Sequence, residues 1–356
     1  MSDTPTAEDH ARAARLVYVS DEEPGFRRRK AGRGFYYLTP DGEKLGSGDH
    51  IDRIRSLAIP PAYEDVWITV EPRGHLQATG RDQRGRKQYR YHPQWSAFRD
   101  DTKYGELAEF ARLLPDIREA VDRDLRRRSL SREKVFASVV WLLDNLLIRI
   151  GNTVYAQQNK SFGLTTLRKK HLEISGSVMR FRFKGKSGKE WNLTHTDRRI
   201  ARVIRSIHEL SGHHLFQYED EDGARHPVRS QDINAYLREA SGAELSSKLF
   251  RTWAGTRLAA IALTELEPPS SKTDGRRKIN EAVDAVASRL GNTRAVCRRC
   301  YIHPRIISTF EEGDLRGELA ETRPARGACE DWMDIDERRL MRWLETEPVQ
   351  TASKKS

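Results

Sequence analysis

One tyrosine near the carboxyl end of the sequence lies among residues that bind phosphate. Tyr301 follows the run Arg-Ala-Val-Cys-Arg-Arg-Cys over residues 294–300. Gly291 is expected to end the preceding helix, and Thr293 to cap a short helix that presents Tyr301 and stops at Pro304. Because a phenol has a pKa of about 10, attack on a phosphodiester requires nearby cations that favour the phenolate. Taken alone, this stretch favours a surface helix with an amphipathic tyrosine, so a nucleophilic role depends on partners elsewhere in the chain.

The cysteines near this tyrosine raise an alternative, a zinc site. Cys297 and Cys300 have metal-ligand spacing, and a fourfold site can be drawn with His303 and Cys329. The second half of such a site lacks a paired knuckle, and the first pair lies on the helix that would carry the nucleophile. We therefore predict ordinary, partly buried thiols and no metal. Three cysteines cannot form a disulfide framework, which fits a reducing compartment.

Length and charge indicate two domains and a polyanionic partner. The 356 residues include 63 Lys and Arg against 52 Asp and Glu, a net charge of +11. Nucleic acid is the natural partner for such a surplus. The amino terminus is polar, unlike a secretory signal, and polar residues interrupt the most apolar run, residues 135–150. We expect a soluble, cytoplasmic protein that binds nucleic acid, and no membrane association.

The first part of the chain is predicted to be rich in β-structure. About twenty weakly structured residues are followed by short β-prone runs between turns, with one helical pattern at residues 49–57. Residues 84–91 alternate aromatic and basic side chains, as expected of a strand that faces a nucleic-acid backbone. We predict a small β-rich domain over residues 1–96.

Beyond this point the pattern becomes helical. Residues 104–114 and 115–126 form two amphipathic patterns, and Ser131 is expected to cap a longer helix that brings Arg149 to its end. Residues 179–193 alternate around a Gly-rich tip, which predicts a hairpin with Lys186 at its turn.

Further helical patterns follow, including the one that carries Arg251 and ends before Pro268. We predict a mainly α-helical domain over residues 97–320. A polar tail is expected over residues 321–356, with one amphipathic stretch at 334–344.

The dispersed polar residues together resemble a known family. Five positions occur in the order and contexts of the type IB DNA topoisomerases, and the chain looks like the small poxvirus-like bacterial branch: Arg149, Lys186, Arg251, Asn292 and Tyr301. The amino-terminal half matches through shorter motifs, which are Arg27-Arg-Arg, Gly32-Arg-Gly34, Ile59-Pro-Pro61, Gly74-His-Leu-Gln-Ala78 and Gly85-Arg-Lys-Gln-Tyr-Arg-Tyr91. The resemblance covers roughly residues 20–315.

The resemblance implies an α+β protein whose β-rich amino-terminal domain and mainly α-helical catalytic domain clamp duplex DNA as a monomer. It implies relaxation of supercoils through a 3′-phosphotyrosyl intermediate, without ATP, metal or another cofactor. Tyr301 would be the nucleophile, Lys186 the general acid, and the remaining three residues ligands of the phosphate: Arg149, Arg251 and Asn292. By the same analogy, DNA contacts are expected from Gln88, Tyr89, Tyr91 and Tyr155.

One position departs from the family pattern. Asn292 stands where the poxvirus and many related enzymes have histidine. An amide donates to a phosphate oxygen but carries no proton, so an acid–base role is not expected there.

Two other classes of protein fit part of this evidence. Tyrosine recombinases share the catalytic fold and chemistry, but they usually carry His-x-x-Arg where this chain has Lys248-Leu-Phe-Arg251, and their amino-terminal domain is typically helical. A non-catalytic basic DNA-binding protein would explain the charge but leave the order of the five residues to chance. The sequence therefore predicts a topoisomerase.

Overall fold

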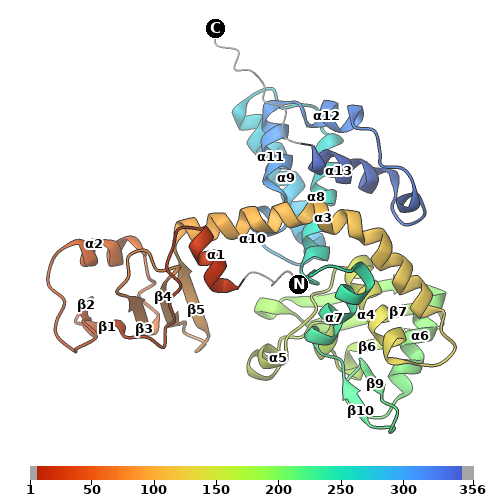
Figure 1. Cartoon of the computed structure of the whole chain (residues 1–356), viewed down its shortest axis with the longest axis horizontal. Coiled ribbons are helices and arrows are strands. Elements are labelled where there is room, and N and C mark those ends of the chain that lie inside the picture. Colours follow the sequence, from red (N-terminus) through yellow and green to blue (C-terminus); the bar gives the residue numbers. More distant parts are fainter. Residues whose placement is uncertain (1–5, 347–356) are drawn as a thin grey trace. The chain divides into compact units, whose positions relative to one another are not determined.

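The structure is a computed structural model that describes residues 6–346, without the side chains of Asp100, Asp101, Lys103, Tyr155 and Gln158. Two compact units are present, Met1–Tyr104 and Gly105–Ser356, and helix α3 (Pro93–Leu125) contains the boundary between them. The mixed fold class predicted from the sequence is confirmed, since one unit contains an antiparallel sheet and the larger one is mainly helical (Figure 1). A domain limit at residue 96 stays a prediction, because α3 runs through this region without a break.

The first unit is built on a five-stranded antiparallel sheet with the order β2-β1-β3-β4-β5. Its elements are α1 (Ala7–Ala13), β1 (Gly25–Ala31), β2 (Gly34–Leu38), α2 (Asp49–Ser56), β3 (Glu64–Thr69), β4 (Leu76–Arg81) and β5 (Lys87–Tyr91). A small apolar core forms where Ile54 of α2 meets Phe26 and Ile68 on the sheet. Strand β5 lies at the edge of the sheet, so one side of it has no strand partner.

The expectation of about twenty weakly structured residues at the start is wrong for α1. The Thr6 hydroxyl accepts a hydrogen bond from Asp9 N at 3.1 Å, and Thr6 N donates to the Asp9 carboxylate at 2.9 Å. This capping box satisfies two amide groups at the helix start. Ala11 on α1 is buried with Leu16 and Trp95. The capping box and this burial together stabilise a helix that propensity alone would leave marginal.

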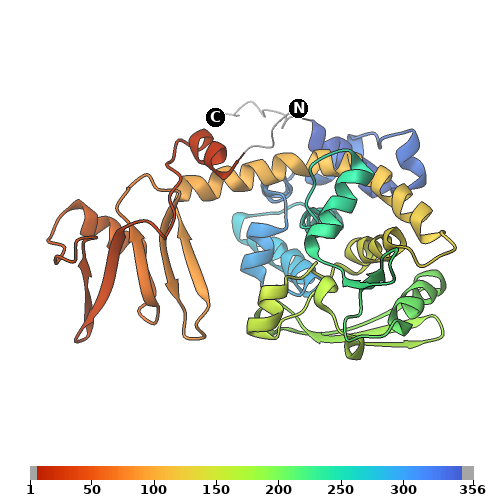
Figure 2. The same ribbon diagram turned by 60° about the horizontal axis from the view of Figure 1, so that its bottom comes forward.

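The second unit contains the large apolar core. Its elements after α3 are α4 (Arg132–Leu146), α5 (Thr153–Asn159), β6 (Leu172–Ser175), β7 (Val178–Lys184), β8 (Glu190–Thr196), α6 (Arg198–Glu209), β9 (Gln217–Glu219), β10 (Arg225–Pro227), α7 (Ser230–Ser241), α8 (Leu249–Thr264), α9 (Lys272–Leu290), α10 (Arg294–Cys300), α11 (Pro304–Glu312), α12 (Leu315–Glu321) and α13 (Ile335–Glu345). Strands β6, β7 and β8 form an antiparallel sheet beside the helices (Figure 2). Within residues 6–346, no helix combines the length and apolar character needed to span a bilayer.

Helix α3 replaces the two shorter helices that the sequence predicts, and Pro115 lies inside it. A proline in a helix costs about 3 kcal/mol because it removes a hydrogen bond and crowds the preceding turn. Each buried large apolar side chain contributes about 1.5–3 kcal/mol. Leu114 and Ile117, on either side of Pro115, are both fully buried. Their burial outweighs the cost of the proline, and the helix continues through it.

The described part of the predicted polar tail is ordered and partly buried. Asp334 caps α13 by accepting from Glu337 N at 2.8 Å. Leu340, Met341 and Trp343 of this helix belong to the large core. The amphipathic stretch predicted at residues 334–344 forms α13, but its apolar face packs against α8, so this part of the chain belongs to the second unit and is not a polar tail.

Candidate active site

Arg251 lies in the first turn of α8 and is almost completely buried. Its guanidinium donates to the Leu147 carbonyl and, at 2.6 Å, to the Leu290 carbonyl. These two carbonyls lie at the carboxyl ends of α4 and α9, where helix dipoles favour a cation. Arg251 therefore joins the ends of two helices, and its own position is fixed by both.

The chain leaves α4 through a left-handed residue. Leu147 has φ 57°, and this turn places Arg149 beside the end of α9. Ser131 caps the start of α4, as predicted, by accepting from Lys134 N at 3.4 Å. Local chemistry therefore determines both ends of the helix that delivers Arg149.

Arg149 orients the amide of Asn292. Its guanidinium donates to Asn292 Oδ1, so the amide oxygen is already occupied. The buried Nδ2 of Asn292 makes no hydrogen bond with any residue that the structure describes. Gly291 precedes it as the left-handed cap of α9, with φ 62°, as the sequence predicts. The site thus holds an amide with its acceptor satisfied and its donor available to an anion.

Tyr301 lies just after α10 rather than on it. It is the C-cap of that helix, with φ −133°, and Thr293 caps the other end as predicted. The prediction that Pro304 stops this helix is wrong, because Pro304 is the first residue of α11. Proline suits that position, where no amide hydrogen is required. The phenol ring is half-buried, and the Arg251 guanidinium carbon lies 5.0 Å from its centre.

Two arginines change the ionisation of this phenol. Burial by itself would raise the pKa of Tyr301, but the charges of Arg251 and Arg149, together with their hydrogen bonds to the phenol, lower it below its usual value. Burial, with a smaller effect from Arg149, lowers the pKa of Arg251 to about 10. Arg251 is therefore still a cation at neutral pH, and its charge makes ionisation of the Tyr301 phenol easier than in water.

Lys186 occupies a different position from the other four predicted residues. As predicted, it lies at the turn of a hairpin, in which β7 and β8 pair with Phe183 opposite Trp191. Its side chain is exposed, and the next residue, Ser187, has φ 64°. In the described structure, Arg149 contacts both Asn292 and Tyr301, and Arg251 contacts Tyr301, whereas Lys186 is outside this chain of contacts.

Sequence reasoning missed two residues that hold the Tyr301 backbone. A Cβ on Gly255 would lie 2.4 Å from the Tyr301 carbonyl oxygen, so only glycine allows α8 to approach this closely. The buried Thr256 hydroxyl accepts from His303 N at 3.1 Å and lies 3.4 Å from the Tyr301 carbonyl. Gly255 is an isolated glycine inside a helical pattern, and such a glycine indicates a close approach by another segment.

The cysteines form no metal site in the described structure. Cys297 is buried, and burial raises its pKa to about 11. Among residues 6–346, no group of three or more His, Cys, Asp and Glu side chains is arranged to hold a metal ion.

The predicted DNA-contact residues of the first unit lie on the edge strand β5. Tyr89 and Tyr91 are exposed, and their rings stack with centres 6.0 Å apart. Gln88 immediately precedes Tyr89, so its side chain points to the opposite face of the sheet, and its amide donates to Asp82 at 3.0 Å. Only the two tyrosines therefore share a surface. The side chain of Tyr155 lies outside the described residues.

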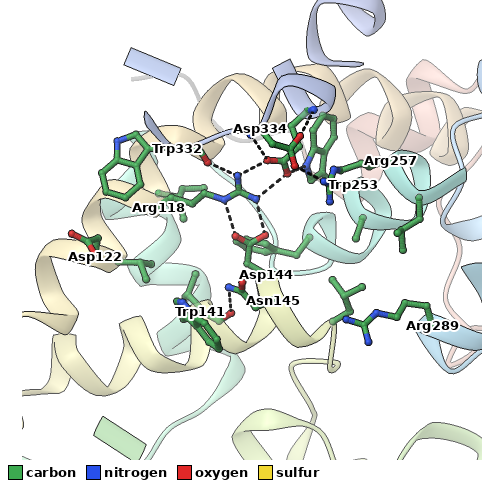
Figure 3. A pocket seen from close by; sticks show the side chains of 18 of the residues that line it. Arg118, Asp122, Trp141, Asp144, Asn145, Trp253, Arg257, Arg289, Trp332 and Asp334 are labelled. Carbon is green, nitrogen blue, oxygen red and sulfur yellow. Dashed lines mark hydrogen bonds and ion pairs between the residues drawn. The ribbon is translucent and has the colours of Figure 1, made fainter. Parts of the chain in front are cut away.

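The larger of two described cavities in the second unit borders these contacts, since Leu147, whose carbonyl accepts from Arg251, is one of its lining residues. Its volume is about 500 Å³, and none of the five predicted catalytic residues lines it (Figure 3). Arg118 crosses it and pairs with Asp144 and Glu337, both at 2.8 Å, while it donates to the Trp332 carbonyl at 2.6 Å. These interactions anchor the segment that leads to α13, which indicates a structural role.

Comparisons with known proteins agree with this geometry. Residues 92–317 match the family model of the eukaryotic DNA topoisomerase I catalytic core, and residues 34–82 match that of the bacterial DNA topoisomerase IB N-terminal domain. The chain is similar to a DNA topoisomerase 1B of Acanthamoeba polyphaga mimivirus, with 34% identity over 296 residues that cover 81% of this chain and 88% of the relative. It is also similar to a DNA topoisomerase 1B of Vaccinia virus (strain Copenhagen), with 20% identity over 268 residues, 73% of this chain and 80% of that one.

Proposed function

This chain belongs to the type IB DNA topoisomerase family of isomerases, and we propose that Tyr301 is the nucleophile with which it nicks and religates one strand of duplex DNA. The Tyr301 oxygen attacks a backbone phosphorus, and the bond from phosphorus to the 5′-oxygen breaks. The products are a 3′-phosphotyrosyl linkage and a free 5′-hydroxyl. Religation reverses these steps, and because the phosphotyrosine conserves the bond energy, we expect that no nucleotide cofactor is consumed.

Three donors are proposed to bind the non-bridging oxygens as charge develops on them. Arg149 and Arg251 offer planar forks of N–H groups, and the available Nδ2 of Asn292 adds a third donor. Loss of one such donor commonly costs about 100- to 1000-fold in rate. The observation that carries the proposal is the convergence of Arg251 and Arg149 on Tyr301, whose pKa these two arginines lower, with Asn292 held beside them by Arg149.

Lys186 is proposed as the general acid. The leaving 5′-oxygen requires a proton as its bond to phosphorus breaks, and an ammonium group at a hairpin turn supplies one once DNA is bound. Its exposed position leaves the turn accessible to the substrate.

The partner follows from the family and the charge. We propose that the chain acts as a monomer on duplex DNA and is a cytoplasmic protein associated with the nucleoid. Tyr89 and Tyr91 are proposed to contact the DNA, and Tyr155 stays a proposal by family analogy. For Gln88 this proposal is weaker, since its amide is bound to Asp82.

A relaxation assay without magnesium or ATP tests the proposed activity. We expect relaxed plasmid together with a denaturant-resistant protein–DNA adduct. Tyr301→Phe should bind DNA but trap no adduct, because the phenol oxygen is lost while the ring remains. Tyr218→Phe is the matched control and should behave like the parent protein. An undiminished adduct in Tyr301→Phe would remove this residue from the mechanism; strand exchange limited to particular sites would indicate a recombinase, and binding alone a non-catalytic protein.

A further inference from the structure

The turn that carries Lys186 contains no buried side chain of its own. Residues 186–189 are all exposed, and Gly185, which precedes them, is buried. Two backbone hydrogen bonds close the turn, from Gly185 N to the Lys189 carbonyl at 2.8 Å and from Gly188 N to the Gly185 carbonyl at 3.1 Å. These bonds shape the turn, but they do not determine where it lies relative to the phosphate-binding groups.

One indole contacts the glycines before Lys186 and before Asn292. A Cβ on Gly185 would lie 2.7 Å from Nε1 of Trp191, and a Cβ on Gly291 would lie 2.8 Å from Cζ2 of the same ring. Neither glycine can carry a side chain without displacing the indole. Trp191 therefore spans the gap between the hairpin turn and the end of α9.

The orientation of this indole is fixed from its own sheet. Trp191 stacks on its cross-strand partner Phe183, with ring centres 5.8 Å apart and planes 6° from parallel. Phe183 is buried in the large core. Stacked cross-strand aromatic pairs stabilise a sheet face and restrict the rotation of both rings. Because the ring cannot rotate freely, its contacts with Gly185 and Gly291 fix the distance between the hairpin turn and the end of α9.

We infer that Trp191 is a positioning residue for the proposed general acid. It holds the Lys186 turn against the Gly291–Asn292 loop, so that the proton donor and the phosphate ligands keep one spacing. This inference rests on the proposed role of Lys186. In the step concerned, the bond from phosphorus to the 5′-oxygen breaks while a proton passes from Lys186 Nζ to that oxygen. A misplaced ammonium would slow this step and leave the attack geometry of Tyr301 unchanged.

Replacement of the bridging 5′-oxygen by sulfur provides the test. A thiol has a pKa of about 8.5, so a thiolate leaves with little need for a proton. Trp191→Ala should cleave ordinary DNA about 10- to 100-fold more slowly, since a misplacement near 1 Å can cost that much. On the sulfur substrate it should regain most of its rate. Trp191→Phe should show a smaller version of the same defect.

Two further variants keep the test independent of folding. Gly185→Ala retains the indole but drives a methyl group into it, so it should show the same defect with sulfur rescue. Trp141→Ala is the matched control: Trp141 is a half-buried tryptophan of the same unit that packs on His195, and its loss should cause no defect specific to the leaving group.

The outcomes distinguish this inference from the proposed function. If Lys186→Ala is rescued by sulfur while Trp191→Ala and Gly185→Ala are equally slow on both substrates, Trp191 has no positioning role and the inference is overturned. If Lys186→Ala itself is not rescued, the acid assignment fails and the inference fails with it. Selective rescue of all three supports both.

Discussion

Asn292 stands where the family resemblance implies a histidine, and its proposed role depends on one nitrogen atom, Nδ2. Asn292→Ala removes the Nδ2 donor and should slow single-turnover cleavage by about 100-fold or more. Asn292→Asp should be slower still, because a carboxylate still pairs with Arg149 but repels the phosphate. Cleavage rates measured with the protein in excess over the DNA would decide this. A rate for Asn292→Asp equal to that of the parent protein would exclude donation by this side chain.

The lowered pKa of Tyr301 leads to a prediction about pH. Arg251 and Arg149 oppose the effect of burial and lower this pKa, so removal of Arg149 should raise it. The phenolate would then form only at higher pH, and the alkaline rise of the cleavage rate should move upward in Arg149→Ala. The measurement is the pH profile of single-turnover cleavage, with Arg168→Ala, an exposed arginine of the same unit, as control. A profile that keeps its midpoint in Arg149→Ala would mean that attack does not depend on this ionisation.

At the scale of elements, helix α8 holds the backbone of Tyr301 through two successive residues, Gly255 and Thr256. Gly255→Ala should push the helix away from the Tyr301 carbonyl, because the new methyl group would meet backbone atoms that cannot rotate away. We expect cleavage to fall about 100-fold with little change in DNA affinity. Thr256→Val should also lose activity, whereas Thr256→Ser keeps the hydroxyl and should retain most of it. Equal rates for Val and Ser at this position would contradict the proposed hold on the backbone.

The docking of α13 depends on a buried ion pair. Burial alone would raise the pKa of Glu337, but its hydrogen bonds and pairing with Arg118 lower it below 4.5. Its stabilising contribution is therefore complete above pH 4.5 and is lost as the pH falls through the lower folded pKa. Glu337→Gln should destabilise the protein by on the order of 3 kcal/mol at neutral pH, since Asp144 still pairs with Arg118. In thermal unfolding, the difference from the parent protein should shrink in acid; a constant difference would place the effect elsewhere.

At the scale of the whole molecule, the net charge of +11 predicts binding that weakens steeply with salt. Each phosphate contact releases counterions, and log affinity falls in proportion to their number. Deletion of residues 1–92 removes the β-sheet unit up to the start of α3 and leaves the large core of the second unit intact. The deleted protein should bind duplex DNA more weakly and with a flatter salt dependence. An unchanged slope would show that the first unit contacts no phosphate.

The sequence by itself determined the features that arise from neighbouring residues. The caps Ser131 and Thr293, the left-handed Gly291 and the hairpin around Lys186 are all formed by hydrogen bonds or backbone preferences within a few residues. Such local rules act wherever the residues occur, so the pattern alone predicts them. The order of the five dispersed polar residues likewise needed no coordinates, and it indicated the family that the comparisons show.

Only the tertiary structure decided how those residues are held. Arg251 donates to carbonyls 104 and 39 residues away in the chain, and Trp191 contacts Gly291. Such long-range contacts produce no repeating pattern in the sequence from which they could be predicted. The same holds for Pro115 inside α3, where burial outweighs a local rule. Long-range packing joins segments whose individual patterns are ordinary. The chemistry could therefore be predicted from residue types and order, whereas the positions that make it work depend on contacts that form only when the chain folds.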